Sequence, residues 1–202
     1  VPFVRILKNG PSGWVSVHDS VAVNASGFES FDMDGDNDRD FILSGVDESG
    51  SPFTKAFFNQ GDFYFTTQEA GTAIAGITTR ADINHDGLFD VRVSGKDGGG
   101  RSVLKTILNT GSDFHVRDSV SFVHALQMIN ADFDSDGLVD LQFFGFADGD
   151  TLNVVTGINI ADPLVHRNVR HQSVGDFDRD GDLDVFQLLD KRGVFSLTLL
   201  EN

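Results

Sequence analysis

Residues 81–95 read ADINHDGLFDVRVSG, an Asp-rich segment that runs directly into an apolar stretch. Three more segments repeat the pattern: FDMDGDNDRDFILSG at 31–45, ADFDSDGLVDLQFFG at 131–145 and GDFDRDGDLDVFQLL at 175–189. Their first aspartates are Asp32, Asp82, Asp132 and Asp176, separated by 50, 50 and 44 positions. A unit recurring at this period predicts a repeat protein.

A second type of segment recurs between the Asp-rich ones. It reads FVRILKNG near the start, TKAFFNQG from Thr54, LKTILNTG from Leu104 and FSLTLLEN at the end, with a degenerate TLNVVTG from Thr151. These segments are rich in Phe, Ile, Leu, Val and Thr and end in Asn or Gly, a composition typical of strands and hairpin turns. No window shows the apolar period of a helix. The fold class is therefore predicted to be all-β.

About four strands fit into each unit, which is the content of one β-propeller blade. We expect a β-propeller-like array of about four four-stranded blades, forming a single repeat domain over residues 1–202. In the first unit, Gly27–Phe31 is the expected first strand and Asp62–Gln68 the fourth, with the Asp-rich loop between the first and second strands. The second type of segment is the expected third strand, and this third-strand segment occurs at both ends of the chain. The surplus copy could stay unpaired, replace its counterpart, or join the sheet edge of another molecule to make an oligomer or filament.

Each Asp-rich loop places oxygen side chains at relative positions 1, 3, 5 and 9. Calcium takes six to eight oxygen ligands, which alternate residues of a curled loop can supply, and the seventh residue is expected to add a backbone carbonyl. The loops at 32–40, 82–90, 132–140 and 176–184 thus predict four Ca²⁺ sites. The predicted ligands are Asp32, Asp34, Asp36, Asp38 and Asp40; Asp82, Asn84, Asp86, Leu88 and Asp90; Asp132, Asp134, Asp136, Leu138 and Asp140; and Asp176, Asp178, Asp180, Asp182 and Asp184.

The sixth loop position needs a backbone turn that glycine tolerates best. It is Gly87, Gly137 and Gly181 in three loops and Asn37 in the first. The second site should be the weakest, because Asn84 brings one negative charge fewer. An EF-hand would need flanking helices and Glu at position 12, where this chain has Leu43, Val93, Phe143 and Gln187. Magnesium fits less well, because it demands a strict octahedron and keeps its waters.

The composition agrees with an extracellular metal-binding domain. Asp and Glu outnumber Lys and Arg by 31 to 15, so the formal charge of −16 disfavours nucleic acid and anionic membranes as partners. Four calcium ions would halve that charge. Cysteine is absent, so calcium could take the stabilising role that disulfides have in other secreted proteins. No apolar run is long enough to insert into a membrane. We expect a secreted or cell-surface protein.

The Asp-rich loops, the Asp-apolar strand after each loop and the third-strand segments resemble the FG-GAP/VCBS repeats, as in integrin α-chain heads and many secreted bacterial proteins. The resemblance covers nearly the whole chain, but the literal FG and GAP signatures are missing and four units are fewer than the usual seven blades. It implies a calcium loop between the first two strands of each blade. It also implies adhesion or recognition, lectin-like in some members, or a scaffold attached to a secreted enzyme.

No enzyme active site is expected. The six histidines share no spacing across the repeats and form no metal-binding pair. Ser44 and Ser94 stand in no nucleophile motif and precede Gly, where the turn chemistry of a strand end would explain them. Nearly all close Asp pairs are committed to the metal loops. The histidines are His18, His85, His115, His124, His166 and His171.

A recognition site for a glycan or protein ligand would need exposed side chains. Trp14 and Tyr64 could stack on a sugar, although packing between blades is the interpretation favoured for both. Gly98–Arg101 and Asp148–Asp150 are expected to be exposed loop tips. The expected function is therefore an extracellular calcium-binding recognition module. A self-assembling structural protein and an accessory domain of a secreted polysaccharide-active enzyme remain alternatives.

Overall fold

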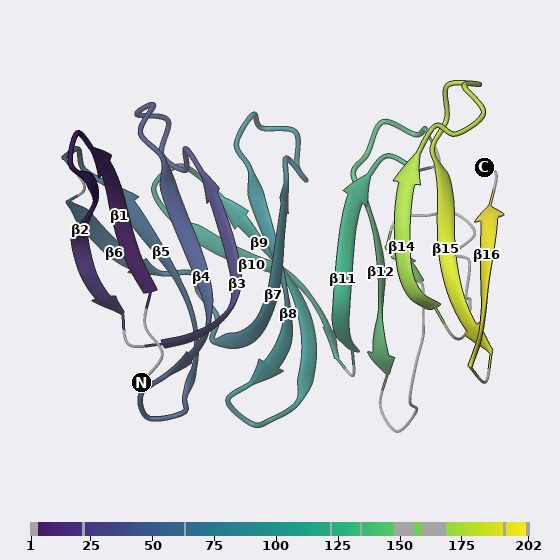
Figure 1. Ribbon diagram of the computed structural model, residues 1–202, viewed down its shortest axis with the longest axis horizontal. Helices are drawn as coiled ribbons and strands as arrows, with labels where there is room; N and C mark the ends of the chain where they lie inside the picture. The colour runs from purple at the N-terminus through teal and green to yellow at the C-terminus, as the bar shows by residue number, and fades with distance from the viewer. Residues whose placement is uncertain are drawn as a thin grey trace. The chain divides into compact units, whose positions relative to one another are not determined.

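The computed structural model describes residues 4–21, 23–62, 64–121, 123–133, 135–147, 156–158, 169–191 and 193–200 (Figure 1). The described residues form strands and turns and no helix, which confirms the all-β prediction. Accordingly, none of these elements is a helix long and apolar enough to cross a membrane. The chain divides into two compact units, residues 1–121 and 122–202.

The first unit contains a two-stranded hairpin and two four-stranded antiparallel sheets. The hairpin pairs β1 (Val4–Gly10) with β2 (Gly13–Val21). The first sheet contains β3 (Val23–Phe31), β4 (Asp40–Asp47), β5 (Pro52–Asn59) and β6 (Phe65–Glu69). The second contains β7 (Ile74–Ala81), β8 (Asp90–Asp97), β9 (Ser102–Asn109) and β10 (Phe114–Ser121).

Both four-stranded sheets are meanders, in which each strand pairs with its neighbours in the chain. They have the strand content that the repeat predicts, with an Asp-rich loop between the first and second strands. The first strand, β3, begins at Val23, earlier than the expected Gly27. The fourth, β6, covers Phe65–Glu69 where 62–68 was expected.

The second unit contains two three-stranded antiparallel sheets among its described residues. One contains β11 (Val123–Ala131), β12 (Asp140–Ala147) and β13 (Thr156–Ile158), and the other contains β14 (Val169–Gly175), β15 (Asp184–Lys191) and β16 (Val194–Leu200). Residues 151–155 of the degenerate third-strand segment and the expected loop tip 148–150 lie outside the described residues. Both terminal copies of the third-strand segment are strands, β1 and β16.

Apolar side chains join the sheets of the first unit into layers. Phe31, Met33 and Phe58 of the first repeat pack with Ile74, Val91 and Ile107 of the second in one buried cluster. On its other face, the first sheet buries Phe41, Leu43 and Phe57, and Val4 and Ile6 of β1 pack against that cluster. The second strand of each sheet is buried along most of its length, as expected of a strand covered on both faces.

The prediction that Ser44 and Ser94 lie at strand ends is wrong. Both lie inside second strands and are fully buried. The Ser44 hydroxyl donates to the Ile74 carbonyl at 2.6 Å and accepts from the Gly76 N–H at 3.1 Å. Gly45 also has a packing role, because an added Cβ would lie 2.3 Å from the Asn24 carbonyl oxygen. Close approach of strands, which a single sequence does not reveal, explains this Ser-Gly pair.

Candidate metal centres

Each Asp-rich loop connects the first strand of a sheet to the second. The ninth loop residue is the first residue of β4, β8, β12 or β15, which confirms the prediction that an Asp begins the next strand. These ninth residues, Asp40, Asp90, Asp140 and Asp184, are at most 1% exposed. Charged groups are this deeply buried only when other groups satisfy them.

Backbone N–H groups satisfy the ninth aspartate in part. Its Oδ2 accepts from the second loop residue in all four copies: Met33 at 2.7 Å and Ile83, Phe133 and Phe177 at 2.9 Å. In the first unit, Oδ1 of Asp40 accepts from Asn59 N–H and Oδ1 of Asp90 from Asn109 N–H, both at 2.8 Å. One carboxylate at the start of the second strand thus accepts hydrogen bonds from both the loop and the end of the third strand.

The sequence interpretation assigned Asn59 and Asn109 only to turns and missed this role. Both asparagines lie 19 residues after the aspartate that they contact. The side-chain amide of Asn109 also donates to the Met33 carbonyl of the first loop at 2.8 Å. The constant spacing is the signal that could have found them. The same spacing after Asp140 falls on Asn159, which lies outside the described residues.

The other loop aspartates shape the loop from inside. The first residue accepts the sixth N–H in three loops, from Asn37, Gly87 and Gly137 at 2.9, 3.0 and 2.9 Å. The fifth residue accepts the seventh N–H in all four, from Asp38, Leu88, Leu138 and Asp182. These bonds curl each loop around the side chains of its first and fifth residues.

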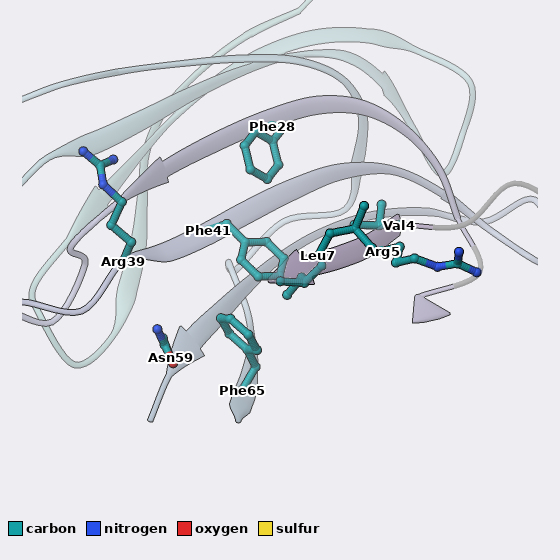
Figure 2. A pocket seen from close by; sticks show the side chains of 9 residues that line it. Val4, Arg5, Leu7, Phe28, Arg39, Phe41, Asn59 and Phe65 are labelled. Atoms are coloured by element: carbon teal, nitrogen blue, oxygen red, sulfur yellow. The ribbon is translucent and has the colours of Figure 1, made fainter. Parts of the chain in front are cut away.

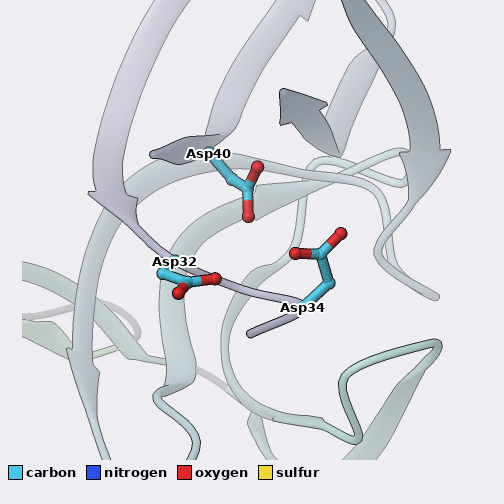
Figure 3. Close-up of side chains that lie close together, drawn as sticks. All are labelled: Asp32, Asp34 and Asp40. Atoms are coloured by element: carbon cyan, nitrogen blue, oxygen red, sulfur yellow. The ribbon is translucent and has the colours of Figure 1, made fainter. Parts of the chain in front are cut away.

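Three carboxylates converge in the first loop. Asp32, Asp34 and Asp40 each offer an oxygen, and these oxygens lie within 4.8 Å of one another (Figure 3). Asp176, Asp178 and Asp184 converge in the same way in the fourth loop. Positions 1, 3 and 9 are therefore brought together as predicted, whereas neither group includes the fifth aspartate, Asp36 or Asp180.

The second loop differs at position 3. Its Asn84 side-chain amide donates to Asp86 Oδ2 at 2.9 Å, and among the described residues Asp82, Asp86 and Asp90 do not converge as in the first loop. In the third loop, Asp134 lies outside the described residues. The seventh-position carbonyls of Asp38, Leu88, Leu138 and Asp182 remain predicted ligands.

The carboxylates are electrostatically costly without a cation. Burial raises the pKa of Asp40, and the nearby charges of Asp34 and Asp36 raise it further, although the N–H groups of Met33 and Asn59 oppose the change. Burial likewise raises the pKa of Asp90, with Asp86 adding to the effect. It also raises the pKa of Asp34, beside Asp36 and Asp32. A bound cation would favour the charged forms and reverse these shifts.

The backbone conformation of the loops confirms the turn predicted at position six and shows a second turn of the same kind at position four. The sixth residue has a positive φ in every loop: 72° at Asn37, 90° at Gly87, 85° at Gly137 and 105° at Gly181. The fourth residue does as well, with values of 82° at Gly35, 59° at His85, 57° at Ser135 and 68° at Arg179. In the first loop, the glycine therefore stands at position four, as Gly35, and position six is Asn37.

The aromatic candidates for a recognition site are exposed, so the favoured interpretation of packing between blades is wrong. Trp14 is 69% exposed in β2, and Tyr64 is 67% exposed in the turn between β5 and β6. The Tyr64 backbone is fixed there, because Gln60 N–H donates to its carbonyl and its own N–H donates to Gly61. Residues 98–101 are exposed, as expected of a loop tip.

The chemistry of the loops fits a hard divalent cation. Three converging carboxylates, all oxygen donors, on a loop closed by its own backbone match the ligands that calcium takes. No nitrogen or sulfur ligand joins either group among the described residues, which disfavours the metals that prefer such ligands, such as zinc and copper.

Comparison with known proteins adds no identification. No protein-family model matches the chain, and no curated protein matches it.

The loop conformation predicts the effect of replacing Gly87 with Ala. Space does not limit the change, since an added Cβ would have no atom within 4 Å, but φ is +90°. We expect a loss of about 1–2 kcal/mol in the free energy of unfolding, measured by urea denaturation in calcium. The matched control is Gly98→Ala, whose Cβ would make an ordinary 3.9 Å contact with Pro52. Equal stability of the two variants would contradict the assignment of the turn.

Proposed function

We propose that the protein is an extracellular calcium-binding β-repeat module for adhesion or recognition, built as a propeller-like array related to the FG-GAP/VCBS repeats. The observation that carries the proposal is the convergence of three carboxylates in the first and fourth loops, at the same loop positions. Calcium here supplies positive charge and links the loop to the strand that follows it. Its role is structural, and no reaction is assigned to it.

The structural role follows from where the loops attach. The carboxylate of Asp40 contacts the loop and the end of β5, and the Asn109 side chain contacts the first loop from the neighbouring sheet. A cation that fixes the loop would therefore also fix the contact between two sheets. Metal affinity would appear directly as folding stability.

A pair of reciprocal substitutions tests the calcium sites. Position three is Asp34 in the first loop and Asn84 in the second. The Oδ1 of Asp34 accepts from the Asp36 N–H at 3.3 Å, and the Oδ1 of Asn84 accepts from the Asp86 N–H at 3.2 Å. Asp34→Asn and Asn84→Asp thus change the charge and keep the acceptor. Isothermal titration should find four ions in the wild type. Asp34→Asn should weaken one site about tenfold and Asn84→Asp should tighten the weakest site, because ligand charge tunes affinity.

The control for this titration is Glu48→Gln, which removes one negative charge in the exposed turn between β4 and β5. It should leave all four affinities unchanged. Equal effects of Glu48→Gln and Asp34→Asn would show that only the overall charge matters, and would contradict the proposed sites.

Recognition of a glycan is supported by the position of Tyr64. The β3–β4 loop and the β5–β6 turn lie at the same end of the first sheet, because both connections run in the same sense of the meander. An exposed, backbone-anchored ring at the same end of the sheet as a proposed calcium loop suits stacking on the apolar face of a sugar. The surrounding acidic residues would favour a neutral sugar over an anionic one.

Glycan-array binding in calcium tests this part of the proposal. We expect binding to neutral glycans that EDTA abolishes and that Tyr64→Ala weakens about fivefold, the loss of roughly 1 kcal/mol of ring stacking. His115→Ala, an exposed ring on β10, is the control and should bind as the wild type does. Binding that survives EDTA and Tyr64→Ala would contradict a glycan site at this end of the sheet.

A further inference from the structure

The last described sheet, β14–β15–β16, presents an exposed apolar face. Phe195, Leu197 and Leu199 alternate along β16 and are 63%, 64% and 37% exposed. Among the described residues, β16 pairs only with β15, so its other edge is open. An apolar face on an open edge strand is a surface on which another sheet can dock.

The register of the sheets shows what normally covers this face. Leu197 stands opposite Leu188, four residues after the ninth loop aspartate, as Thr54 stands opposite Ser44 in the first sheet. Ser44 and Thr54 are fully buried, and both bond to Ile74, the first residue of the next sheet. The exposed face of β16 therefore corresponds to the face that, in the first sheet, is covered by the first strand of the following sheet.

The first unit offers the complementary surface. Phe28 of β3 occupies the position that Thr78 has in β7, four residues before the first loop aspartate. Thr78 lies against the preceding sheet, since a Cβ added to Gly27 would come within 2.8 Å of its methyl group. Phe28 is instead 58% exposed.

A pocket of about 360 Å³ opens beside Phe28 (Figure 2). Its apolar lining includes Val4, Ile6 and Leu7 of β1 with Phe28, Phe41 and Phe65 of the first sheet. Consecutive residues of β1 line it, so the pocket runs along that strand, which pairs only with β2 among the described residues. An incoming strand could pair with the edge of β1 while covering Phe28 and Phe41.

Charge favours an uncharged or acidic occupant. The only charged residues in the lining are Arg5 and Arg39, which lie at opposite ends of the pocket in Figure 2. Residues 193–200, which form β16 and its turn, contain no charged residue. The strand therefore brings no positive charge toward these arginines.

We propose that the β14–β16 sheet of one copy of this chain docks on a second copy, with β16 beside β1 and its apolar face over Phe28 and Phe41. The contact is a sheet-on-sheet packing like the one that joins the first two complete sheets within the first unit, but β16 lies beside β1, because β1 already packs against the first sheet in the third-strand position. Because the two surfaces differ, the association is head-to-tail and can extend beyond a dimer.

Two one-sided variants test the proposal by sedimentation velocity in calcium. Phe28→Ser disables only the accepting surface and Leu197→Ser only the donating one, and both residues are exposed enough to be replaced without unfolding the chain. The wild type should form dimers and larger species as concentration rises. Each variant alone should be monomeric, and an equimolar mixture should form dimers but nothing larger, because one intact pair of surfaces remains.

His115→Ser, an exposed ring on β10 outside both surfaces, is the control and should assemble as the wild type does. Circular dichroism and calcium titration on each variant separate loss of assembly from loss of folding or of metal binding. A wild type that stays monomeric at high concentration would overturn the proposal, as would a mixture of the two variants that remains monomeric. Dimers formed by either variant alone would also overturn it, because they would show a symmetric interface.

Discussion

The buried carboxylate of Asp40 connects the loop, the strand that begins at its own position and the end of the third strand, and Asp90 does the same in the next repeat. Both carboxylates are fully buried, which costs free energy unless N–H groups and a counter-charge surround them. The N–H groups are supplied by the fold. The proposed calcium ion would contribute the counter-charge. Without it, burial raises the pKa of both carboxyl groups, which means that the charged forms are disfavoured.

This constraint links local chemistry to the arrangement of the first unit. The Asn109 side chain donates to the carbonyl of Met33, so the first loop is bonded to the neighbouring sheet as well as to its own. Met33 is itself fully buried in the apolar cluster between the two sheets. A loop that lost its shape would therefore disturb the packing of the sheets, which is why we propose a structural role for calcium before any role in ligand binding.

The sequence predicted the features that follow from local chemistry. The period of the aspartates located all four loops, and the glycine at position six, as at Gly87, identified a left-handed turn. It could not identify the second such turn at position four, where His85 shows no glycine signal. Nor could it show that Ser44 is buried or that Trp14 is exposed, because both depend on how closely a neighbouring sheet approaches. The spacing of 19 residues between Asp40 and Asn59 is visible in the sequence, but only the hydrogen bond between them shows why it recurs.

Thermal unfolding with and without calcium tests the central claim most directly. If calcium holds the loops, and through them the sheets, EDTA should lower the melting temperature. Added calcium should restore it, whereas the same concentration of magnesium should not. When the free calcium concentration is a hundred times the Kd of a site, that site contributes about 2.7 kcal/mol to the free energy of unfolding. A melting temperature that is the same in calcium and in EDTA would contradict the account.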